Sequence, residues 1–354
     1  MAEVLALRER FAHMSAISGY DALFSHLPSD ITLHSVFCNF KKMYARGLGR
    51  LLQGTAKLAN GSGFYNAQSV EAEIKLVIKA IRQKPSLIHY SYGEPYLGYT
   101  GLLKTVFGGP VVVTNHQPVS WWEQNQHFLK KYSHIEQAIC LDEYARDYFN
   151  SMLPGKAVFI PHGVSTDFYH PIANGKKKDG IFRIVFAGRY LRDTATLARV
   201  AKNISASSIP VHFDMVYTGK AFLSGTPLDA IKDASNVTWH TDVHETELRH
   251  IYQHADCCLI PLLDCSANNA ILEAMACGLP IISTDIPAIH TYVDNSMALL
   301  GRHHNADDLC GMIQFLYENE NLRVQMGLNA RRKVESRFSW QLVAGQTAAL
   351  FKSL

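Results

Sequence analysis

Residues 260–285 read IPLLDCSANNAILEAMACGLPIISTD, and this stretch indicates how the surrounding chain folds. The apolar run at residues 257–260, just before the stretch, is typical of a buried parallel strand. Residues 270–277 contain strong helix formers and stop at Gly278, a residue favoured just past a helix end. Residues 281–284 form a second short apolar run. The pattern predicts a strand, a polar loop, a helix and a parallel strand.

The polar loop of this unit lies where open α/β sheets bind ligands, outside the carboxyl end of a strand and at a helix N-terminus. Unpaired backbone amides and the positive end of the helix dipole favour a phosphate group there. The candidates for binding it are Ser266, Asn268, Asn269 and Ala270.

Glu273 follows within the first turns of the predicted helix, among apolar residues. One interpretation is a carboxylate that supports the helix dipole. The other is an acceptor for ligand hydroxyls, such as those of a ribose. The sequence leaves both open.

Residues 269–280 resemble the donor-site signature of retaining glycosyltransferases of family 4, also called group 1. That family places two glutamates eight positions apart. Glu273 matches the second, and the resemblance implies that it holds the nucleotide ribose. Cys265 stands at the place of the first, so the chain departs from the family at that position.

The composition restricts the class of protein. A chain of 354 residues with 47% hydrophobic residues is long enough for two domains. A formal net charge of +3 argues against a nucleic-acid partner. Seven cysteines without a C-x-x-C pair argue against a disulfide framework or a zinc knuckle. With no signal-like start and no run of 18 apolar residues, we expect a cytoplasmic protein, at most peripheral to the inner face of the membrane.

The first half of the chain contains six short apolar segments that alternate with helical ones, a doubly wound pattern. Ser18, Gly19 and Tyr20 follow the first segment, and they resemble a small-residue loop that lies on the acceptor side in this family. An ordinary tight turn explains the same residues equally well.

His116 comes at the carboxyl end of the apolar segment that begins at Val111. Such a position suits a site residue, although a lone loop histidine usually has a structural role. The family has a histidine at the end of this strand, near the donor sugar. On that resemblance we predict that His116 is a site residue.

Residues 31–70 contain five basic side chains and no acidic ones, interleaved with apolar residues. A basic amphipathic stretch is able to lie on an anionic lipid surface, so residues 40–57 are a candidate for peripheral membrane contact. The alternative is a solvated helix face beside a core stripe. The same surface would also suit a lipid-linked or anionic acceptor.

The second half begins with an apolar segment that ends in Gly188 and Arg189, with Arg192 three residues on. An arginine on a glycine-permitted turn at the end of a strand is well placed for a diphosphate. In the family an arginine and a lysine do this. Arg189 matches the arginine, whereas Arg192 is a shifted substitute for the lysine or, alternatively, forms a surface ion pair with Asp193.

Asp242 and Val243 follow a later apolar segment, where the backbone of the family reads the edge of the base. Two histidine pairs have a spacing that suits a metal, His240 with His244 and His250 with His254. Histidines on the wet face of a helix explain them better. We predict no metal.

The expected fold is GT-B: two Rossmann-like domains that face each other across a cleft. Residues 1–170 would bind the acceptor, residues 171–180 would form a linker, and residues 181–337 would bind the nucleotide-sugar. As the resemblance implies, a C-terminal helix at residues 338–354 would return to the first domain.

The expected reaction is metal-independent transfer of a sugar to a hydroxyl acceptor with retention of configuration. The residues predicted to carry it are His116, Arg189 and Glu273, with no cofactor besides the nucleotide-sugar co-substrate. The rival functions are a sugar phosphorylase, a nucleotide-sugar epimerase and a non-catalytic homologue that binds nucleotide.

Overall fold

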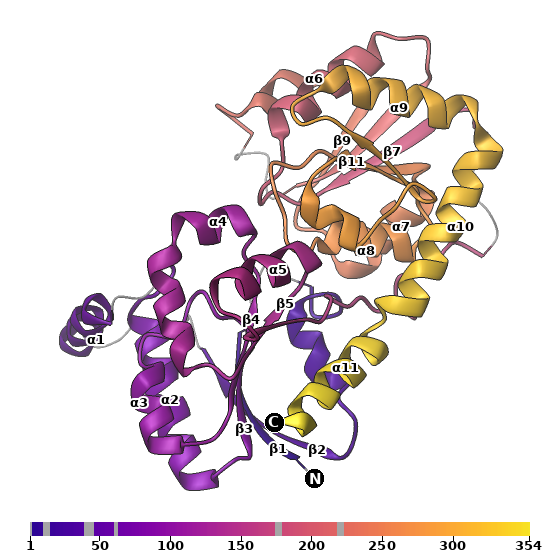
Figure 1. Cartoon of the computed structure of the whole chain (residues 1–354). Helices are drawn as coiled ribbons and strands as arrows, with labels where there is room; N and C mark the ends of the chain where they lie inside the picture. The colour runs from indigo at the N-terminus through magenta and orange to yellow at the C-terminus, as the bar shows by residue number, and fades with distance from the viewer. Residues whose placement is uncertain (1, 10–14, 39–45, 60–62, 174–178, 218–222) are drawn as a thin grey trace. The chain divides into compact units, whose positions relative to one another are not determined.

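A computed structural model describes residues 2–9, 15–38, 46–59, 63–173, 179–217 and 223–354. The chain divides into two compact units (Figure 1). The first consists of residues 1–162 together with residues 340–354, and the second of residues 163–339. In the described ranges, none of the helices combines the length and the apolar composition that a bilayer crossing requires.

The first unit is built on a six-stranded parallel sheet with the order β2-β1-β3-β4-β5-β6. Its inner strands are largely buried, as expected for a sheet covered on both faces, and its two edge strands are partly buried. The strand order changes direction between β1 and β3, which are neighbours in the sheet. The strands are β1 (Ala2–Arg8), β2 (Ile31–Phe37), β3 (Leu87–Tyr90), β4 (Val111–Asn115), β5 (Gln137–Cys140) and β6 (Ala157–Phe159).

Helices cover both faces of this sheet. In Figure 1, α2 and α3 lie on one face, and α11 lies with η1 on the other. Trp340, at the start of α11, donates its indole N–H to the carbonyl of Ile17 at 3.0 Å. The helices are η1 (Tyr20–Ser25), α1 (Arg46–Leu58), α2 (Ala67–Gln83), α3 (Thr100–Phe107), α4 (Val119–Gln124), η2 (Gln126–His134), α5 (Glu143–Met152) and α11 (Trp340–Ser353).

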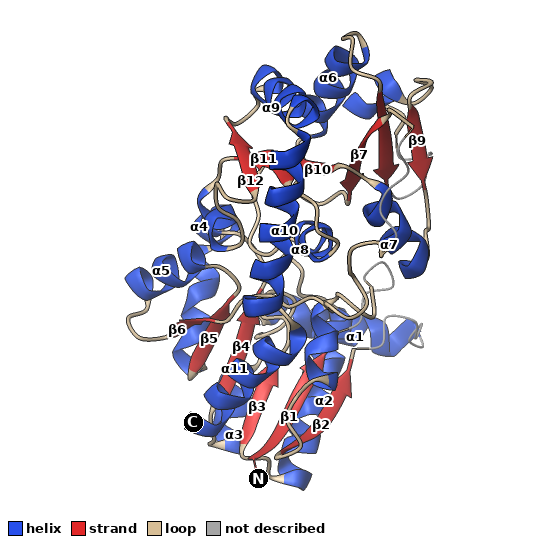
Figure 2. Ribbon diagram, turned by 90° about the vertical axis from the view of Figure 1, so that its right-hand side faces the viewer, coloured by secondary structure: helices blue, strands red, loops and turns tan. Residues whose placement is uncertain are grey.

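The second unit repeats the architecture with the strand order β12-β11-β10-β7-β8-β9. Figure 2 shows the strands of its sheet, whose pairings are all parallel. Here the order changes direction between β7 and β10. The strands are β7 (Phe182–Ala187), β8 (Val211–Val216), β9 (Val237–His240), β10 (Cys257–Ile260), β11 (Ile281–Thr284) and β12 (Ala298–Gly301).

The helices of the second unit are arranged in two layers. The layer formed by α6, η4 and α9 covers a core that includes Phe186, Phe213 and Ile313. The opposite layer contains α7, α8 and α10, which contact β7, β10 and β11 or one another. The helices are α6 (Thr194–Ser205), η4 (Pro227–Ile231), α7 (Glu245–His254), α8 (Asn269–Ala276), η5 (Pro287–Thr291), α9 (Ala306–Glu318) and α10 (Glu320–Arg337).

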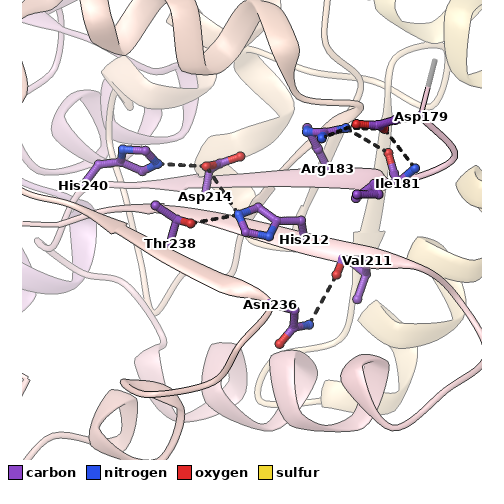
Figure 3. Close-up of polar contacts among 9 residues, drawn as sticks. All are labelled: Asp179, Ile181, Arg183, Val211, His212, Asp214, Asn236, Thr238 and His240. Carbon is purple, nitrogen blue, oxygen red and sulfur yellow. Dashed lines mark hydrogen bonds and ion pairs between the residues drawn. The ribbon is translucent and has the colours of Figure 1, made fainter. Parts of the chain in front are cut away.

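The strands β8 and β9 carry a polar cluster on the face opposite the α6 core (Figure 3). His240 Nε2 lies 2.8 Å from Asp214 Oδ1, and His212 Nε2 lies 3.0 Å from the Thr238 hydroxyl. Along β8, His212 and Asp214 alternate with buried Phe213 and Met215, as strand geometry requires.

Two Rossmann-like α/β units were predicted, and the two sheets confirm them. The boundary differs from the expected one, because residues 163–170 belong to the second unit. Val164 N–H bonds the carbonyl of Phe338 at 2.8 Å, and Arg331 bonds the carbonyls of Thr166 and Tyr169. The predicted linker lies partly outside the described residues, at 174–178.

Candidate functional site

In the second unit, the two loops at the change of strand order run side by side. One loop follows β7 and the other follows β10. Arg192 and Leu262 form an antiparallel bridge, and Leu263 N–H donates to the carbonyl of Leu191 at 2.9 Å. Open α/β sheets bind their ligands at this place, where the strand order reverses. The predicted phosphate-binding loop and the predicted arginine turn therefore meet at one edge.

Arg192 joins the two loops through its guanidinium group. Its Nη2 donates to Asn268 Oδ1 at 3.1 Å, while Nε and Nη1 donate to the carbonyls of Ala187 and Tyr190. Burial lowers the pKa of Arg192, and the neighbouring Cys265 and Tyr252 act in the opposite direction. An arginine remains charged in such a setting. Arg192 thus supplies a fixed positive charge to the site.

Gly188 makes room for this arrangement. Its backbone has a φ of +92°, in the region that favours glycine. A Cβ atom at this position would lie 2.9 Å from Arg192 Nη2. The glycine predicted at the turn therefore suits this backbone conformation, and a side chain there would displace the guanidinium group of Arg192.

Asn268 is the N-cap of α8, and its Oδ1 accepts from Ile271 N–H at 3.4 Å as well as from Arg192. The residue is 6% exposed. Its Nδ2 group is buried and has no hydrogen-bond partner among the described residues. A buried amide donor without a partner costs free energy, and a ligand acceptor would remove that cost.

The alternative in which Arg192 forms a surface ion pair with Asp193 is wrong. Asp193 is buried, caps α6 by accepting from Thr196 N–H at 2.9 Å, and contacts His304 at 2.6 Å. Arg189 is exposed on the same turn as Arg192. The two arginines thus differ: Arg192 is fixed between the loops, and Arg189 lies at the surface.

Glu273 is buried in α8, and its Oε2 accepts from the Tyr252 hydroxyl at 3.1 Å. Tyr252 belongs to α7, so this bond ties the two helices together. Cys265, at the position of the family's first glutamate, is also buried. Ser266 is buried in the same loop, and Asn269 and Ala270 form the first turn of α8.

Asp242 and Val243 lie in the turn after β9, the edge strand of the sheet. Asp242 has a φ of +55°, the left-handed conformation that Asp tolerates better than most residues. One strand, β8, separates β9 from β7. Within the described residues, no hydrogen bond joins this turn to the Arg192–Asn268 pair.

In the first unit, His116 lies just beyond β4, beside the place where the strand order reverses. Its Nε2 lies 2.8 Å from the carbonyl oxygen of Ser91, and its ring stacks on Tyr92 with centroids 3.8 Å apart. Burial lowers the pKa of His116 to about 3, with a smaller opposing effect of the Ser91 bond. The imidazole is therefore neutral at physiological pH.

Of the predicted acceptor-side residues, Tyr20 contacts His116. The two rings meet edge to face at 4.8 Å, and the Tyr20 hydroxyl bonds the Thr114 hydroxyl at 2.9 Å. Ser18 is buried, and Gly19 precedes η1 with an ordinary φ of −65°. Tyr20 thus supports the histidine, and its hydroxyl group already has a protein partner.

Sequence reasoning missed Glu94, a buried carboxyl group beside His116. Its Oε1 accepts from the backbone N–H groups of His116 at 2.5 Å and of Gln117 at 2.7 Å. Burial raises the pKa of Glu94 to about 7, against the effect of these bonds. The signal in the sequence that could have indicated Glu94 is a glycine followed by an acidic residue, just past the carboxyl end of a buried strand.

The histidines of the two pairs have partners within the protein. His240 contacts Asp214, and the His244 ring accepts from Thr246 N–H at the start of α7. His250 and His254 stack on one another along α7. Within the described residues, no group of three or more His, Cys, Asp or Glu side chains is arranged to hold a metal ion.

Comparison with known proteins gives a family match in the second unit. The model of the family described as "Glycosyl transferases group 1" matches residues 181–319. The D-inositol 3-phosphate glycosyltransferase of Arthrobacter sp. is 23% identical over 295 residues, covering 78% of this chain. The chain spans 61% of the length of that relative.

Solved structures match the whole chain in fold. Sucrose-phosphate synthase from Thermosynechococcus elongatus has a TM-score of 0.74 at 16% identity, covering 100% of this chain and 99% of its own. HepE from Anabaena, solved with UDP-glucose, has a TM-score of 0.72 at 13% identity, with both chains fully covered. The predicted GT-B fold is thereby confirmed. The predicted resemblance is confirmed too: over residues 181–319, which contain the Arg192–Asn268 site, the chain is similar to the group 1 glycosyltransferases.

Proposed function

We propose that the protein transfers a sugar from a nucleotide-sugar to a hydroxyl acceptor, with retention at the anomeric carbon. The observation that carries the proposal is the Arg192–Asn268 pair at the N-terminus of α8, with its buried amide donor left over. The name of one relative describes a glycosyltransferase, and one structural neighbour was solved with UDP-glucose. A sugar diphosphate supplies the acceptor oxygens that such a site requires.

The donor would be held by groups with distinct roles. Arg192, Asn268 Nδ2 and the first-turn amides of α8 bind the diphosphate, and Arg189 joins them from the surface. Glu273 takes the ribose hydroxyls, and the turn at Asp242 and Val243 reads the base. Each charge-assisted bond contributes about 1.5–3 kcal/mol.

In this reaction the bond between the anomeric carbon and the diphosphate oxygen breaks, and a bond to the acceptor oxygen forms on the same face of the sugar. The acceptor proton ends on the leaving diphosphate. As that group gains charge, the arginines and the end of α8 stabilise it more strongly than they stabilise the intact donor. The proposal therefore needs no metal and no protein nucleophile.

We assign the acceptor to the first unit, with His116 contributing to sugar recognition. An acceptor at a lipid surface is consistent with α1, where Leu58 is 84% exposed and lies beside exposed Lys57. Residues 40–45 of the predicted membrane-contact stretch lie outside the described residues, as do the side chains of residues 46–50. Cosedimentation with anionic vesicles tests this contact, with neutral vesicles as the control.

The function itself is tested by thermal shift with UDP-, GDP- and ADP-sugars, followed by nucleotide release with the best binder. A donor at 10- to 100-fold excess over its dissociation constant should stabilise the protein by roughly 1.4–2.7 kcal/mol. Proton NMR of the product then reports the anomeric configuration.

The same assays distinguish the rival functions. Turnover only with inorganic phosphate would indicate a phosphorylase. Interconversion of nucleotide-sugars without release of the nucleotide would indicate an epimerase. Binding without turnover would indicate a non-catalytic homologue.

A further inference from the structure

The loop after β3, residues 91–94, holds the loop after β4 in place. Gly93 N–H donates to the carbonyl of Thr114 at 2.8 Å, and a Cβ atom at Gly93 would lie 2.5 Å from Val113. Glu94 then reaches beyond the end of β4, where its Oε1 accepts the two backbone N–H groups of His116 and Gln117. One carboxylate oxygen thus fixes the backbone on which His116 stands.

The same loop fixes the ring of His116. A carbonyl oxygen only accepts hydrogen bonds, so the contact with Ser91 requires the proton on Nε2. In a neutral imidazole, Nδ1 then carries a lone pair. No described residue bonds Nδ1. The ring therefore offers a hydrogen-bond acceptor, to which a ligand hydroxyl would donate.

Holding the loop with Glu94 costs the fold stability. The side chain is 2% exposed, and burying a carboxyl group disfavours its charged form. Another carboxyl group, that of Glu9, is buried after β1, and the charge of Glu94 helps to raise the pKa of Glu9. Groups that cost stability are typically retained where function needs them.

We infer that Glu94 is a positioning residue: it holds the loop after β4 so that His116 keeps its Nε2–H tautomer and presents Nδ1 to a substrate hydroxyl. The inference rests on the proposed function, because it deepens the role given there to His116. Glu94 itself need not touch the substrate.

The test compares Glu94→Leu, which leaves both amides without an acceptor, with Glu94→Gln, which retains an oxygen for them. Kinetics use the nucleotide-release assay with the best donor. We expect Glu94→Leu to lower kcat/KM about 100-fold, the loss that a misplaced site residue produces. Glu94→Gln should restore most of that loss.

A double-mutant cycle with His116→Ala separates positioning from a merely structural role. If Glu94 acts through His116, adding Glu94→Leu to His116→Ala should cost little further activity. Losses that multiply would overturn the inference. Glu73→Leu is the matched control, since Glu73 is a buried carboxyl group of the same unit that accepts from the Tyr65 hydroxyl. It should lower the melting temperature and leave the tautomer of His116 unchanged.

A second readout does not depend on activity. The ¹⁵N chemical shifts of His116 report its tautomer, and we expect the Nε2–H form in the wild type and in Glu94→Gln, but a mixture in Glu94→Leu. If the wild type released no nucleotide from any sugar, the proposed function would fail while this spectrum still tested Glu94. An unchanged tautomer in Glu94→Leu would refute the positioning role.

Discussion

At the scale of single residues, a substitution of Asn268 should lower ligand affinity without changing the stability of the fold. Asn268→Asp retains the oxygen that caps α8 and that accepts from Arg192. Aspartate is about as good an N-cap as asparagine, so the free energy of unfolding should change by less than about 0.5 kcal/mol. The donor Nδ2 is lost, however, and a negative charge replaces it. We expect affinity for the best nucleotide-sugar to fall roughly 10- to 100-fold by calorimetry.

The same substitution at another helix start provides the control. Asn66 caps α2 by accepting from Gln68 N–H at 2.8 Å. Asn66→Asp should leave both stability and donor affinity nearly unchanged. Should Asn268→Asp bind the donor as tightly as the wild type, the diphosphate would not lie at the start of α8.

The two arginines of the turn should respond differently to substitution. Arg192 is bonded to both loops, so Arg192→Ala should lower the melting temperature as well as donor affinity, because Asn268 and two carbonyls lose their partner. Arg189 is exposed, so Arg189→Ala should leave the melting temperature within error. If Arg189 faces the developing charge, kcat should fall more than donor affinity. Equal losses in both quantities would contradict that role.

At the scale of elements, the close approach of α10 to α8 depends on a glycine. A Cβ atom at Gly327 would lie within van der Waals overlap of the carbonyl oxygen of Gly278, which follows α8. Glycine to alanine in a helix interior normally stabilises by about 1 kcal/mol. Here we expect Gly327→Ala to destabilise by about 1–3 kcal/mol, the usual cost of overpacking.

Gly311 in α9 is the matched control, since no described atom outside its chain neighbours and the backbone of its own helix lies within 4 Å of a Cβ built there. Gly311→Ala should stabilise by about 0.5–1 kcal/mol in a denaturant titration. A stabilising Gly327→Ala would show that α10 shifts freely on α8. Because α8 carries Asn268 and Glu273, donor affinity should fall together with stability in Gly327→Ala.

Elements with a strong local pattern were predicted well. The strands at residues 257–260 and 281–284 have the predicted bounds, and the helix predicted at residues 270–277 spans Asn269–Ala276. The strand β12 was missed, because its four residues are short and the chain around them gives little alternation.

The positions of the candidate-site loops could be predicted, because these loops follow buried strands. Which residues of different loops contact one another could not be predicted. Glu94 and His116 are 22 residues apart, and Arg192 and Asn268 are 76 apart. Such pairs depend on strand order, which local patterns do not reveal. The resemblance indicated Glu273 as a candidate site residue, whereas its bond to Tyr252 depends on how α7 packs against α8.

At the scale of the whole molecule, buried carboxyl groups of the first unit and a paired carboxylate of the second should lose their contributions to stability in opposite directions of pH. In the first unit, burial raises the pKa values of Glu9, Glu73 and Glu94 to about 7. In the second, Asp294 has a pKa lowered to about 2, because bonds from Ser296 and Lys333 outweigh burial. Its contribution to stability is present above the unfolded pKa of 3.8 and is lost as the pH falls through 2.

Glu73 allows the pH response of the first unit to be tested away from the site. Its folded pKa of about 7 lies above the reference value of 4.5, so the folded state retains a proton that the unfolded state has lost between these values. The stability from this group is therefore complete below pH 4.5 and is lost as the pH rises through 7. The full shift corresponds to roughly 3 kcal/mol.

Glu73→Gln removes the ionisation while retaining an oxygen for the hydroxyl groups of Tyr65 and Tyr90. We expect the variant to melt at a higher temperature than the wild type at pH 8, and at a similar temperature at pH 5. Thermal unfolding followed by circular dichroism at both pH values measures the difference. If the melting temperatures of Glu73→Gln and the wild type differed by the same amount at pH 5 and at pH 8, Glu73 would keep an ordinary pKa. The first unit would then tolerate a buried charge between α2 and β3.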